Sequence, residues 1–403
     1  MVDTTHLTQL ACHTRLWVGL SGGLDSMVLL HALACEPTLA SKLHAVHVHH
    51  GLSPHADAWQ AHCEHVCAAL SVPLVTHHVQ LDKHQANLEE AARDARFEIF
   101  ETCVQQHDCL VLAHHQDDQA ETLMFRLLRG TGIDGLAAMK TYRAFGRGHV
   151  ARPFLTIRKH QLHTYAKTHA LVWVEDESNQ ARQFSRNYLR HEIMPRLQTI
   201  WPRAIERISS CALHSQEAQA NLDDLAHIDC PELALKPSHV SLETLRALPL
   251  RRLKNVLRVW LKHQDMQALS TVQLKVLIRE VVFAQSDAMP LMRIQSCTIR
   301  RYREVLYVVR DVKKPKPCVI PTLPVALQIP EGAQVDVRYR KGGETLFLHG
   351  QTKSLKSLFQ IWGIPPWERD TIPLIFIDNT LAAVLDFAIG DDYHQISCDE
   401  QDA

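Results

Sequence analysis

At 403 residues the chain is longer than one hydrophobic core usually allows, which predicts two or three domains. Hydrophobic residues make up 46% and charged residues 22%, proportions typical of a soluble globular protein, and no apolar run approaches the ~20 residues of a membrane helix. The net charge is only −1, yet residues 235–316 hold 17 Lys and Arg against 6 Asp and Glu. Such asymmetry indicates a region that binds an anionic partner, although a solvated basic face would show the same surplus.

The cysteines and the N-terminus favour a cytoplasmic protein. Cysteine occurs 11 times, but the closest pair, Cys63 and Cys67, is one helical turn apart and no Cys-x-x-Cys is present. This spacing argues against a zinc ribbon or an iron–sulfur site and for reduced thiols. Residues 1–11 lack the basic head and apolar stretch of a secretory signal. We therefore expect the protein in the cytoplasm and not in a membrane.

Residues 1–201 alternate apolar, strand-like runs with helical patterns. The predicted strands cover residues 15–20, 43–48, 74–79 and 109–113. The predicted helices cover residues 25–34, 57–70, 87–103 and 116–128. This alternation predicts a doubly wound α/β domain with a parallel sheet, in which ligands bind at the carboxyl ends of the strands.

The pattern changes after residue 201. Helical periodicity covers residues 203–225, 245–263 and 272–284, and strand-like runs follow at 291–300 and 304–309. A segment rich in Pro and Lys, residues 313–324, is typical of an interdomain linker. We therefore predict three domains: an α/β domain over residues 1–201, a mostly helical basic domain over 202–312 and a small α+β domain over 325–396.

The strongest local motif is a glycine-containing turn between the first predicted strand and helix. It consists of Ser21, Gly22, Gly23, Leu24, Asp25 and Ser26. Glycines let the backbone approach phosphate oxygens, and the amides at the start of the next helix stabilise negative charge. The two serine hydroxyls would add donors to the phosphates, and Asp25 could hold a bridging Mg²⁺. The longer Gly-x-x-x-x-Gly-Lys-Ser loop of other ATPases is absent.

A second motif, AHHQDDQAET, covers residues 113–122 at the end of the fourth predicted strand. Asp118 and Glu121 are three residues apart and therefore share one face of the predicted helix. Two carboxylates that face a ligand site require a cation, which would be an amine or a metal. Stabilisation of the helix N-terminus by acidic residues explains the same pattern equally well.

Two further segments combine arginines with helical spacing. In residues 87–97, Glu89 and Arg93 are four residues apart, which a solvated salt-bridged helix would also produce. After residues 175–179 (EDESN), Arg186 and Arg190 share a helical face and could bind phosphates, with exposed structural arginines as the equal alternative.

Histidines gather on the second predicted strand and on the loop that follows it. They are His44, His47, His49, His50 and His55. No carboxylate or thiolate partner lies nearby in the pattern, so we do not predict a metal site there.

Together these segments resemble one family, the tRNA(Ile)-lysidine synthases. The shared blocks in the first domain are SGGLDS at 21–26, HVHHGL at 47–52, EEAARDARF at 89–97, HHQDDQAET at 114–122, RLLRGTGIDGL at 126–136, EDESN at 175–179 and RNYLR at 186–190. Residues 342–344 and 356–367 resemble the last domain of that family. Single blocks occur in other ATP pyrophosphatases, whereas the order of all of them is specific.

The resemblance implies a PP-loop domain of the adenine nucleotide hydrolase type, with ATP and Mg²⁺ as cofactors. It implies ligation of free L-lysine to C2 of the wobble cytidine of an isoleucine tRNA with a CAU anticodon, through an adenylated base. AMP and pyrophosphate would be released, and the codon read would change from AUG to AUA. The oligomeric state stays open, with a homodimer as one option.

The resemblance also implies residue roles. Asp118 and Glu121 would hold the lysine amine, and Arg93 would hold substrate or charge on the leaving phosphate. The phosphate loop would bind ATP, with His114 near the nucleotide. For tRNA contacts we select Arg186 and Arg190, and in the basic region Arg251, Arg252 and Lys254.

Three alternative functions make different demands on the sequence. A tRNA thiolase would need paired or catalytic cysteines, and the spacing of Cys63, Cys67, Cys103 and Cys109 does not provide them. An amidotransferase-type synthetase would need a nucleophilic cysteine, often at the very N-terminus, where Val2 stands. A nucleotide-sensing RNA-binding module would not need the intact acidic residues of the site.

Overall fold

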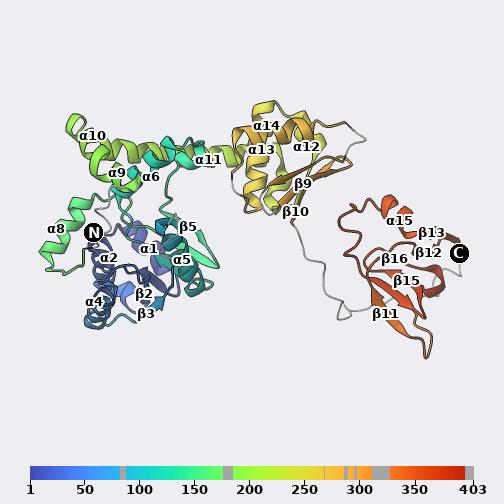
Figure 1. Ribbon diagram of the computed structural model, residues 1–403, viewed down its shortest axis with the longest axis horizontal. Helices are drawn as coiled ribbons and strands as arrows, with labels where there is room; N and C mark the ends of the chain where they lie inside the picture. The colour runs from blue at the N-terminus through green and yellow to red at the C-terminus, as the bar shows by residue number, and fades with distance from the viewer. Residues whose placement is uncertain are drawn as a thin grey trace. The chain divides into compact units, whose positions relative to one another are not determined.

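A computed structural model describes residues 1–81, 88–175, 185–266, 268–285, 289–294, 297–310 and 327–394. The chain forms two compact units, Met1–Asp224 and Leu225–Ala403 (Figure 1). The predicted linker and residues 176–179 of the EDESN block lie outside the described residues. Within the described part of the chain, every helix is too short or too polar to cross a membrane.

The first unit is built on a six-stranded sheet with the order β3-β2-β1-β4-β6-β5. The strands are β1 (Leu16–Gly19), β2 (Leu43–His49), β3 (Leu74–His78), β4 (Cys109–Val111), β5 (Tyr142–Phe145) and β6 (Gly148–Ala151). Neighbouring strands are parallel except β5, which pairs antiparallel with β6. The predicted parallel α/β sheet is confirmed, and the β5–β6 hairpin is an addition to it.

Helices cover both faces of this sheet (Figure 1). The helices of this unit are α1 (Thr4–Ala11), α2 (Leu24–Ala34), α3 (Pro37–Ala40), α4 (Ala56–Ala69), α5 (Leu88–Cys103), α6 (Gln116–Leu128), α7 (Ile133–Leu136), α8 (Lys159–Thr168), α9 (Ser185–Tyr188), the π-helix η2 (Leu189–Ile193), α10 (Met194–Ile200) and α11 (Ala204–Asp229). The helices α1 to α4 and α8 pack on one face of the sheet and α5 on the other, whereas α6, α10 and α11 share a separate buried cluster of Ala120, Met194 and Ile205. Leu16 and Val18 pack in the core beneath α2 and α4, whereas Trp17 packs in the core beneath α5. Successive strand residues point to opposite faces, so one short apolar strand supports two cores.

The second unit begins within α11 and contains a four-stranded antiparallel sheet, β7-β10-β9-β8. The strands are β7 (His239–Ser241), β8 (Leu291–Ile294), β9 (Cys297–Tyr302) and β10 (Val305–Arg310). The helices are η3 (Pro231–Leu235), α12 (Leu242–Ala247), α13 (Leu250–His263), α14 (Thr271–Leu277) and the π-helix η4 (Ile278–Val282). The helix predicted over 245–263 divides at Pro249, the N-cap of α13, because a proline interrupts a preceding helix.

The last part of the chain is a small α+β domain, as predicted. Its strands are β11 (Val335–Arg338), β12 (Thr345–Leu348), β13 (Gln351–Ser354), β14 (Leu374–Ile377), β15 (Thr380–Val384) and β16 (Ala388–Ile389), joined by α15 (Leu355–Ile361) and η5 (Asp391–Tyr393). The sheet order is β11-β14-β15-β16, with β12-β13 as a separate pair. Leu358 and Phe359 of α15 pack with Leu374 in its core.

Candidate active site

The turn after β1 has the backbone geometry of a phosphate-binding loop. Gly22 has φ +85°, and a Cβ there would lie 2.9 Å from the Val174 side chain, so both conformation and space require glycine. Gly23 is the N-cap of α2 and makes no side-chain capping bond. The amides at the start of α2 therefore keep their donors for a ligand, and the helix dipole favours an anion there.

The two serines of the loop differ in their roles, although we expected both to face phosphate. The Ser26 hydroxyl donates to the Gly23 carbonyl at 2.9 Å and lies 3.2 Å from the Ser21 hydroxyl. Ser26 is buried, and its hydroxyl stabilises the turn through this hydrogen bond, whereas Ser21 is exposed. Leu24 packs against the core beneath α2, so only its backbone is available to a ligand.

Asp25 lies in the first turn of α2, and one of its carboxylate oxygens is buried but unpaired within the described ranges. Its Oδ2 is 3.6 Å from Nε2 of His115, and its Oδ1 has no hydrogen-bond partner among the described residues. The described part of the chain contains no cluster of three His, Cys, Asp or Glu that could hold a metal ion. A magnesium ion at Asp25 would therefore take most of its oxygen ligands from phosphates and water, which is its usual preference beside nucleotides.

His115 connects the phosphate loop to α6. The sequence pattern did not predict this role for His115 or for its neighbour His114. It is the N-cap of α6 in a reciprocal capping box: its Nδ1 accepts from the Asp118 amide at 3.2 Å, and its own amide donates to Asp118 Oδ2 at 3.1 Å. Burial would lower the pKa of His115, but the charges of Asp118 and Asp25 raise it. The sequence signal for this capping role was the spacing of three residues between His115 and the acidic Asp118, which is the spacing of a capping box.

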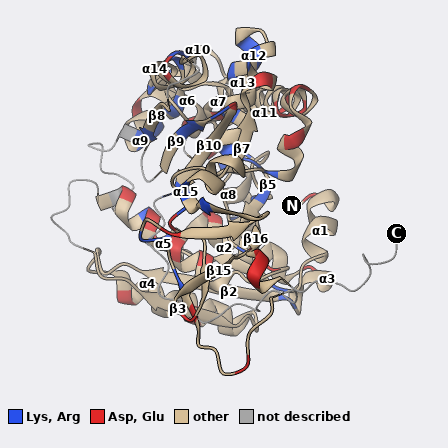
Figure 2. Ribbon diagram, turned by 90° about the vertical axis from the view of Figure 1, so that its right-hand side faces the viewer, with Lys and Arg blue, Asp and Glu red and all other residues tan. Residues whose placement is uncertain are grey.

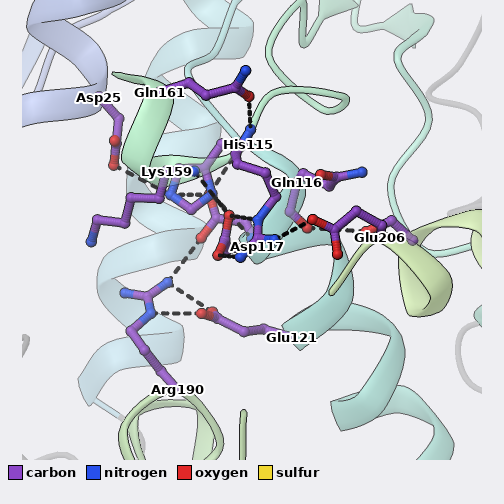
Figure 3. Close-up of polar contacts among 12 residues, drawn as sticks. Asp25, His115, Gln116, Asp117, Glu121, Lys159, Gln161, Arg190 and Glu206 are labelled. Carbon is purple, nitrogen blue, oxygen red and sulfur yellow. Dashed lines mark hydrogen bonds and ion pairs between the residues drawn. The ribbon is translucent and has the colours of Figure 1, made fainter. Parts of the chain in front are cut away.

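Arg190 binds two of the three carboxylates of α6, those of Asp118 and Glu121, and Figure 3 shows its bonds to Glu121. Its Nε donates to Glu121 Oε1 at 2.8 Å, and its Nη2 donates to Glu121 Oε2 at 2.7 Å and to Asp118 Oδ1 at 2.8 Å. Arg186 is more distant, at 3.6 Å from Glu121 and 3.8 Å from Asp118. The cation paired with Asp118 and Glu121 is thus the guanidinium of Arg190. Arg186 and Arg190, which we selected for tRNA contacts, both lie beside carboxylates in this structure.

This pairing sets the charge of the site. Burial alone would raise the pKa of Asp118, but the positive charges of His115, Arg186 and Arg190 lower it to about 2. Burial likewise opposes the charge of Arg190, and its bonds to Glu121 and Asp118 raise its pKa. Glu121 is only 3% exposed. Both carboxylates are therefore buried, and both are paired with the same cation.

A second ion cluster, around Asp117 of α6, joins neighbouring helices. Arg158 donates to both oxygens of Asp117, at 3.2 and 3.3 Å, and also binds Glu206; Figure 3 shows Asp117 and Glu206. The backbone amide of Lys159 adds a bond of 2.9 Å to Asp117. Because these residues belong to α6, the start of α8 and α11, the cluster joins three helices and holds α6 in place.

A cavity of about 740 Å³ opens beside the loop at the carboxyl ends of the strands. Of the predicted site residues, it is lined by Ser21, Asp25, Ser26, Arg93, His114 and Asp118. Burial lowers the pKa of His114 to about 3, so its imidazole is neutral at pH 7. Arg96, which no motif singled out for this role, lines the same cavity next to Arg93, because α5 places both over it.

Two imidazoles of β2, those of His47 and His49, have partners that the sequence pattern did not indicate. Oδ1 of Asp57 lies 3.0 Å from Nε2 of His49, and the Cys63 thiol lies 3.8 Å from His47 Nδ1. The expectation that no carboxylate or thiolate lies near these histidines was therefore wrong, because α4 folds back against β2. They still form no metal cluster within the described ranges.

The residues chosen for RNA from the basic region, Arg251, Arg252 and Lys254, lie on α13 of the second unit, and Figure 2 colours Lys and Arg positions blue. Arg251 is exposed and Lys254 is half-buried. Arg252 instead donates to Asp229 Oδ2 at 2.8 Å, and the Asp229 side chain is only 2% exposed.

Family models match three parts of the chain. Residues 2–197 match the PP-loop domain, 241–307 the TilS substrate binding domain and 335–401 the TilS substrate C-terminal domain. The PP-loop match establishes ATP binding by the first unit. Among solved structures, a U34-tRNA thiolase from Methanococcus maripaludis is similar at 17% identity and a TM-score of 0.42, over 52% of this chain and 74% of that one, which is too distant to bear on function.

Curated relatives match nearly the whole chain. A tRNA(Ile)-lysidine synthase of Legionella pneumophila (strain Paris) is 44% identical over 94% of this chain and 92% of its own length. Those of Pseudomonas fluorescens (strain Pf0-1) and Coxiella burnetii (strain RSA 493) are 40% and 35% identical, over 93% and 95% of this chain and 89% and 91% of theirs. The chain is a member of the tRNA(Ile)-lysidine synthase family.

Proposed function

We propose that this protein joins free L-lysine to C2 of the wobble cytidine of an isoleucine tRNA with a CAU anticodon, at the expense of ATP. Membership of the family supports the reaction class. The observation that carries the site assignment is the cavity that brings the phosphate loop, Asp25 and Asp118 together at the carboxyl ends of the strands.

The reaction would proceed in two steps. The C2 carbonyl oxygen of cytidine attacks the α-phosphate of ATP, forming an adenylated base and releasing pyrophosphate. The ε-amine of lysine, after losing a proton, then attacks C2, and the C2–O bond to AMP breaks. The loop amides of α2 would hold the phosphates in the first step, and Arg93 would stabilise charge on the phosphate in both.

Magnesium fits the site because Asp25 has a buried carboxylate oxygen beside the loop that has no hydrogen-bond partner among the described residues. When bound there, the ion would neutralise charge on the phosphates. Asp118 and Glu121 would hold the lysine amine and orient it for attack, which converts a bimolecular encounter into a positioned one.

The second unit would bind the tRNA. The surplus of Lys and Arg over residues 235–316 is suited to the phosphate backbone, and we assign contacts to Arg251 and Lys254, while Arg252 has a bond within the protein. We further propose that the protein acts in the cytoplasm, where the tRNA substrate and ATP are present.

A thiolase reaction is disfavoured by the thiols themselves. Cys63 and Cys109 are fully buried, and burial raises the pKa of each to about 12. A thiol with so high a pKa is not a nucleophile near neutral pH. These cysteines are therefore suited to packing in the core.

The test separates the two half-reactions with Glu121→Gln, which keeps the side-chain volume and removes the charge. We expect adenylated tRNA to form and persist, with the KM for lysine raised and the KM for ATP little changed. The change is measured by release of labelled pyrophosphate and by incorporation of labelled lysine into the tRNA. Asp118→Asn should act similarly.

Glu206→Gln serves as the control, because it removes a carboxylate from the Arg158 cluster and leaves the acidic pair of α6 intact. Both half-reactions should persist in that variant. Loss of adenylation in Glu121→Gln with lysine affinity retained would mean that the pair shapes the nucleotide site. The amine pocket would then lie elsewhere, with Glu89 the next carboxylate to test.

A further inference from the structure

The acidic pair proposed for the lysine amine is already occupied by a side chain of the protein. Arg190 binds both oxygens of Glu121 and Oδ1 of Asp118 at 2.7–2.8 Å. Oδ2 of Asp118 accepts from the His115 amide at 3.1 Å. All four oxygens of the pair are thus engaged before any substrate binds.

Lysine and Arg190 therefore compete for the same oxygens. The ammonium group of lysine has three donors on a single nitrogen, so its acceptor oxygens must surround that one atom. The guanidinium of Arg190 is planar and has donors on several nitrogens, so it can bind both carboxylates at once. If lysine displaced Arg190 and nothing replaced the carboxylates, the arginine side chain, which is 25% exposed, would be left as an unpaired charge. Leaving a partly buried charge unpaired costs free energy. Displacement needs another anion for Arg190.

The neighbouring cavity supplies a place for that anion. Asp118 and Asn187 line it together with Ser21 and Asp25 of the phosphate loop, and Asn187 lies one turn before Arg190 in the chain. Asp25 is also close enough to contribute to the raised pKa of Arg190. Phosphate groups held by the loop would lie near the guanidinium.

The backbone around Arg190 is unusual. It belongs to the π-helix η2, Leu189–Ile193, between the α-helical turns α9 and α10. π-Helical turns are rare and occur frequently at functional sites, because the extra residue in the turn changes the direction in which side chains leave the helix. A small change in this turn would re-aim the arginine.

We propose that Arg190 exchanges partners during the reaction: a bound phosphate group takes its guanidinium, and this releases Asp118 and Glu121 to receive the lysine amine. The proposal rests on the proposed function, since it assumes that the acidic pair is the amine site. It predicts that lysine binds well only after phosphate has entered. Lysine would then be kept from the site until an activated base can be formed.

The test is isothermal titration of L-lysine into the full chain under four conditions: alone, with Mg²⁺ and a non-hydrolysable ATP analogue, with the isoleucine tRNA, and with both. In the wild type we expect the component that supplies the phosphate group, the ATP analogue or the tRNA, to lower the Kd for lysine by roughly 10-fold. This is a typical coupling between two binding sites. The separate analogue and tRNA arms show whether the phosphate comes from the nucleotide or from the RNA. Absence of coupling in every arm overturns the proposal.

Arg190→Met distinguishes partner exchange from simple attraction between lysine and a bound phosphate. We expect this variant to bind lysine tightly without phosphate and to lose the coupling. Arg190→Lys keeps a positive charge but cannot span both carboxylates, so its coupling should be intermediate. Arg196→Met is the control, because it removes an exposed arginine 3.5 Å from Glu192 of η2 and leaves the carboxylates of α6 paired, and its coupling should equal that of the wild type. Coupling that persists unchanged in Arg190→Met overturns the proposal.

Failure of this inference and failure of the proposed function give different results. If Glu121→Gln does not weaken lysine binding under any condition, the acidic pair is not the amine site and the proposed function fails at this point. If Glu121→Gln weakens lysine binding but Arg190→Met retains the coupling, only the exchange of partners is wrong.

Discussion

The arginines of the first unit's active site and those of α13 in the second unit have the same chemistry but different roles. On the site side, Arg190 and Arg158 both bind carboxylates of α6. On α13, Arg252 binds a buried carboxylate of α11, whereas Arg251 is exposed and makes no ion pair within the described ranges. Arg251 and Arg252 thus differ in one respect: a buried carboxylate lies within hydrogen-bonding distance of Arg252 only.

This contrast divides the charged residues into engaged and open groups. An engaged arginine stabilises the fold, since removing it leaves a buried carboxylate unpaired. An open charge contributes little to stability and is available to a ligand. Asp25 belongs to neither group: its Oδ2 lies 3.6 Å from His115 Nε2, whereas its Oδ1 is buried and has no hydrogen-bond partner among the described residues. The division can be tested by substitutions that should affect function alone or stability alone.

The largest effect is expected for Asp25→Ala. This variant should reduce pyrophosphate release by roughly 10³-fold or more, since it removes the carboxylate proposed to hold magnesium. Its tRNA affinity should remain near that of the wild type, and its unfolding midpoint should not fall, because the variant removes a buried carboxylate oxygen that has no hydrogen-bond partner in the described part of the chain. Near-normal pyrophosphate release would contradict the phosphate-loop assignment.

Arg252→Ala should mainly affect stability. Asp229 would lose its partner while its side chain is 2% exposed, which we expect to cost about 3 kcal/mol in the free energy of unfolding of the second unit. Urea unfolding followed by circular dichroism measures this change. An unchanged midpoint would place Arg252 among the open charges, and a role for this residue in tRNA binding would then gain support.

The smallest effect is expected for Arg251→Ala. Its free energy of unfolding should change by less than about 0.5 kcal/mol, because the side chain is exposed. The slope of log affinity for tRNA against log salt should become shallower by roughly 0.7–0.9 for each phosphate that the variant no longer neutralises. Lys254→Ala gives a second measurement of the same kind. If neither slope changes, α13 is merely solvated, and RNA contacts should be sought near Arg338, Lys353 and Lys356.

Local sequence pattern was sufficient for much of this architecture. The bounds predicted for the helix at 116–128 coincide with α6, Gln116–Leu128, because its periodicity and acidic first turn are local signals. The phosphate loop was identified for the same reason: strand, glycine turn and helix are adjacent in the chain. The β5–β6 hairpin and the division at Pro249 were missed, since short strands and helix ends are weakly marked.

The partners of the charged residues, in contrast, follow from long-range contacts. Asp118 and Glu121 were recognisable as a pair from their spacing, but Arg190 lies 69 residues after Glu121, and no local pattern joins them. The choice between Arg251 and Arg252 depends on Asp229, which α11 brings opposite one of them. The order of the amino acids is enough to say which groups carry charge and which segments form helices and strands. Which charges remain open to substrates depends on the folded arrangement, because the energy of an ion pair is set by its distance and its surroundings.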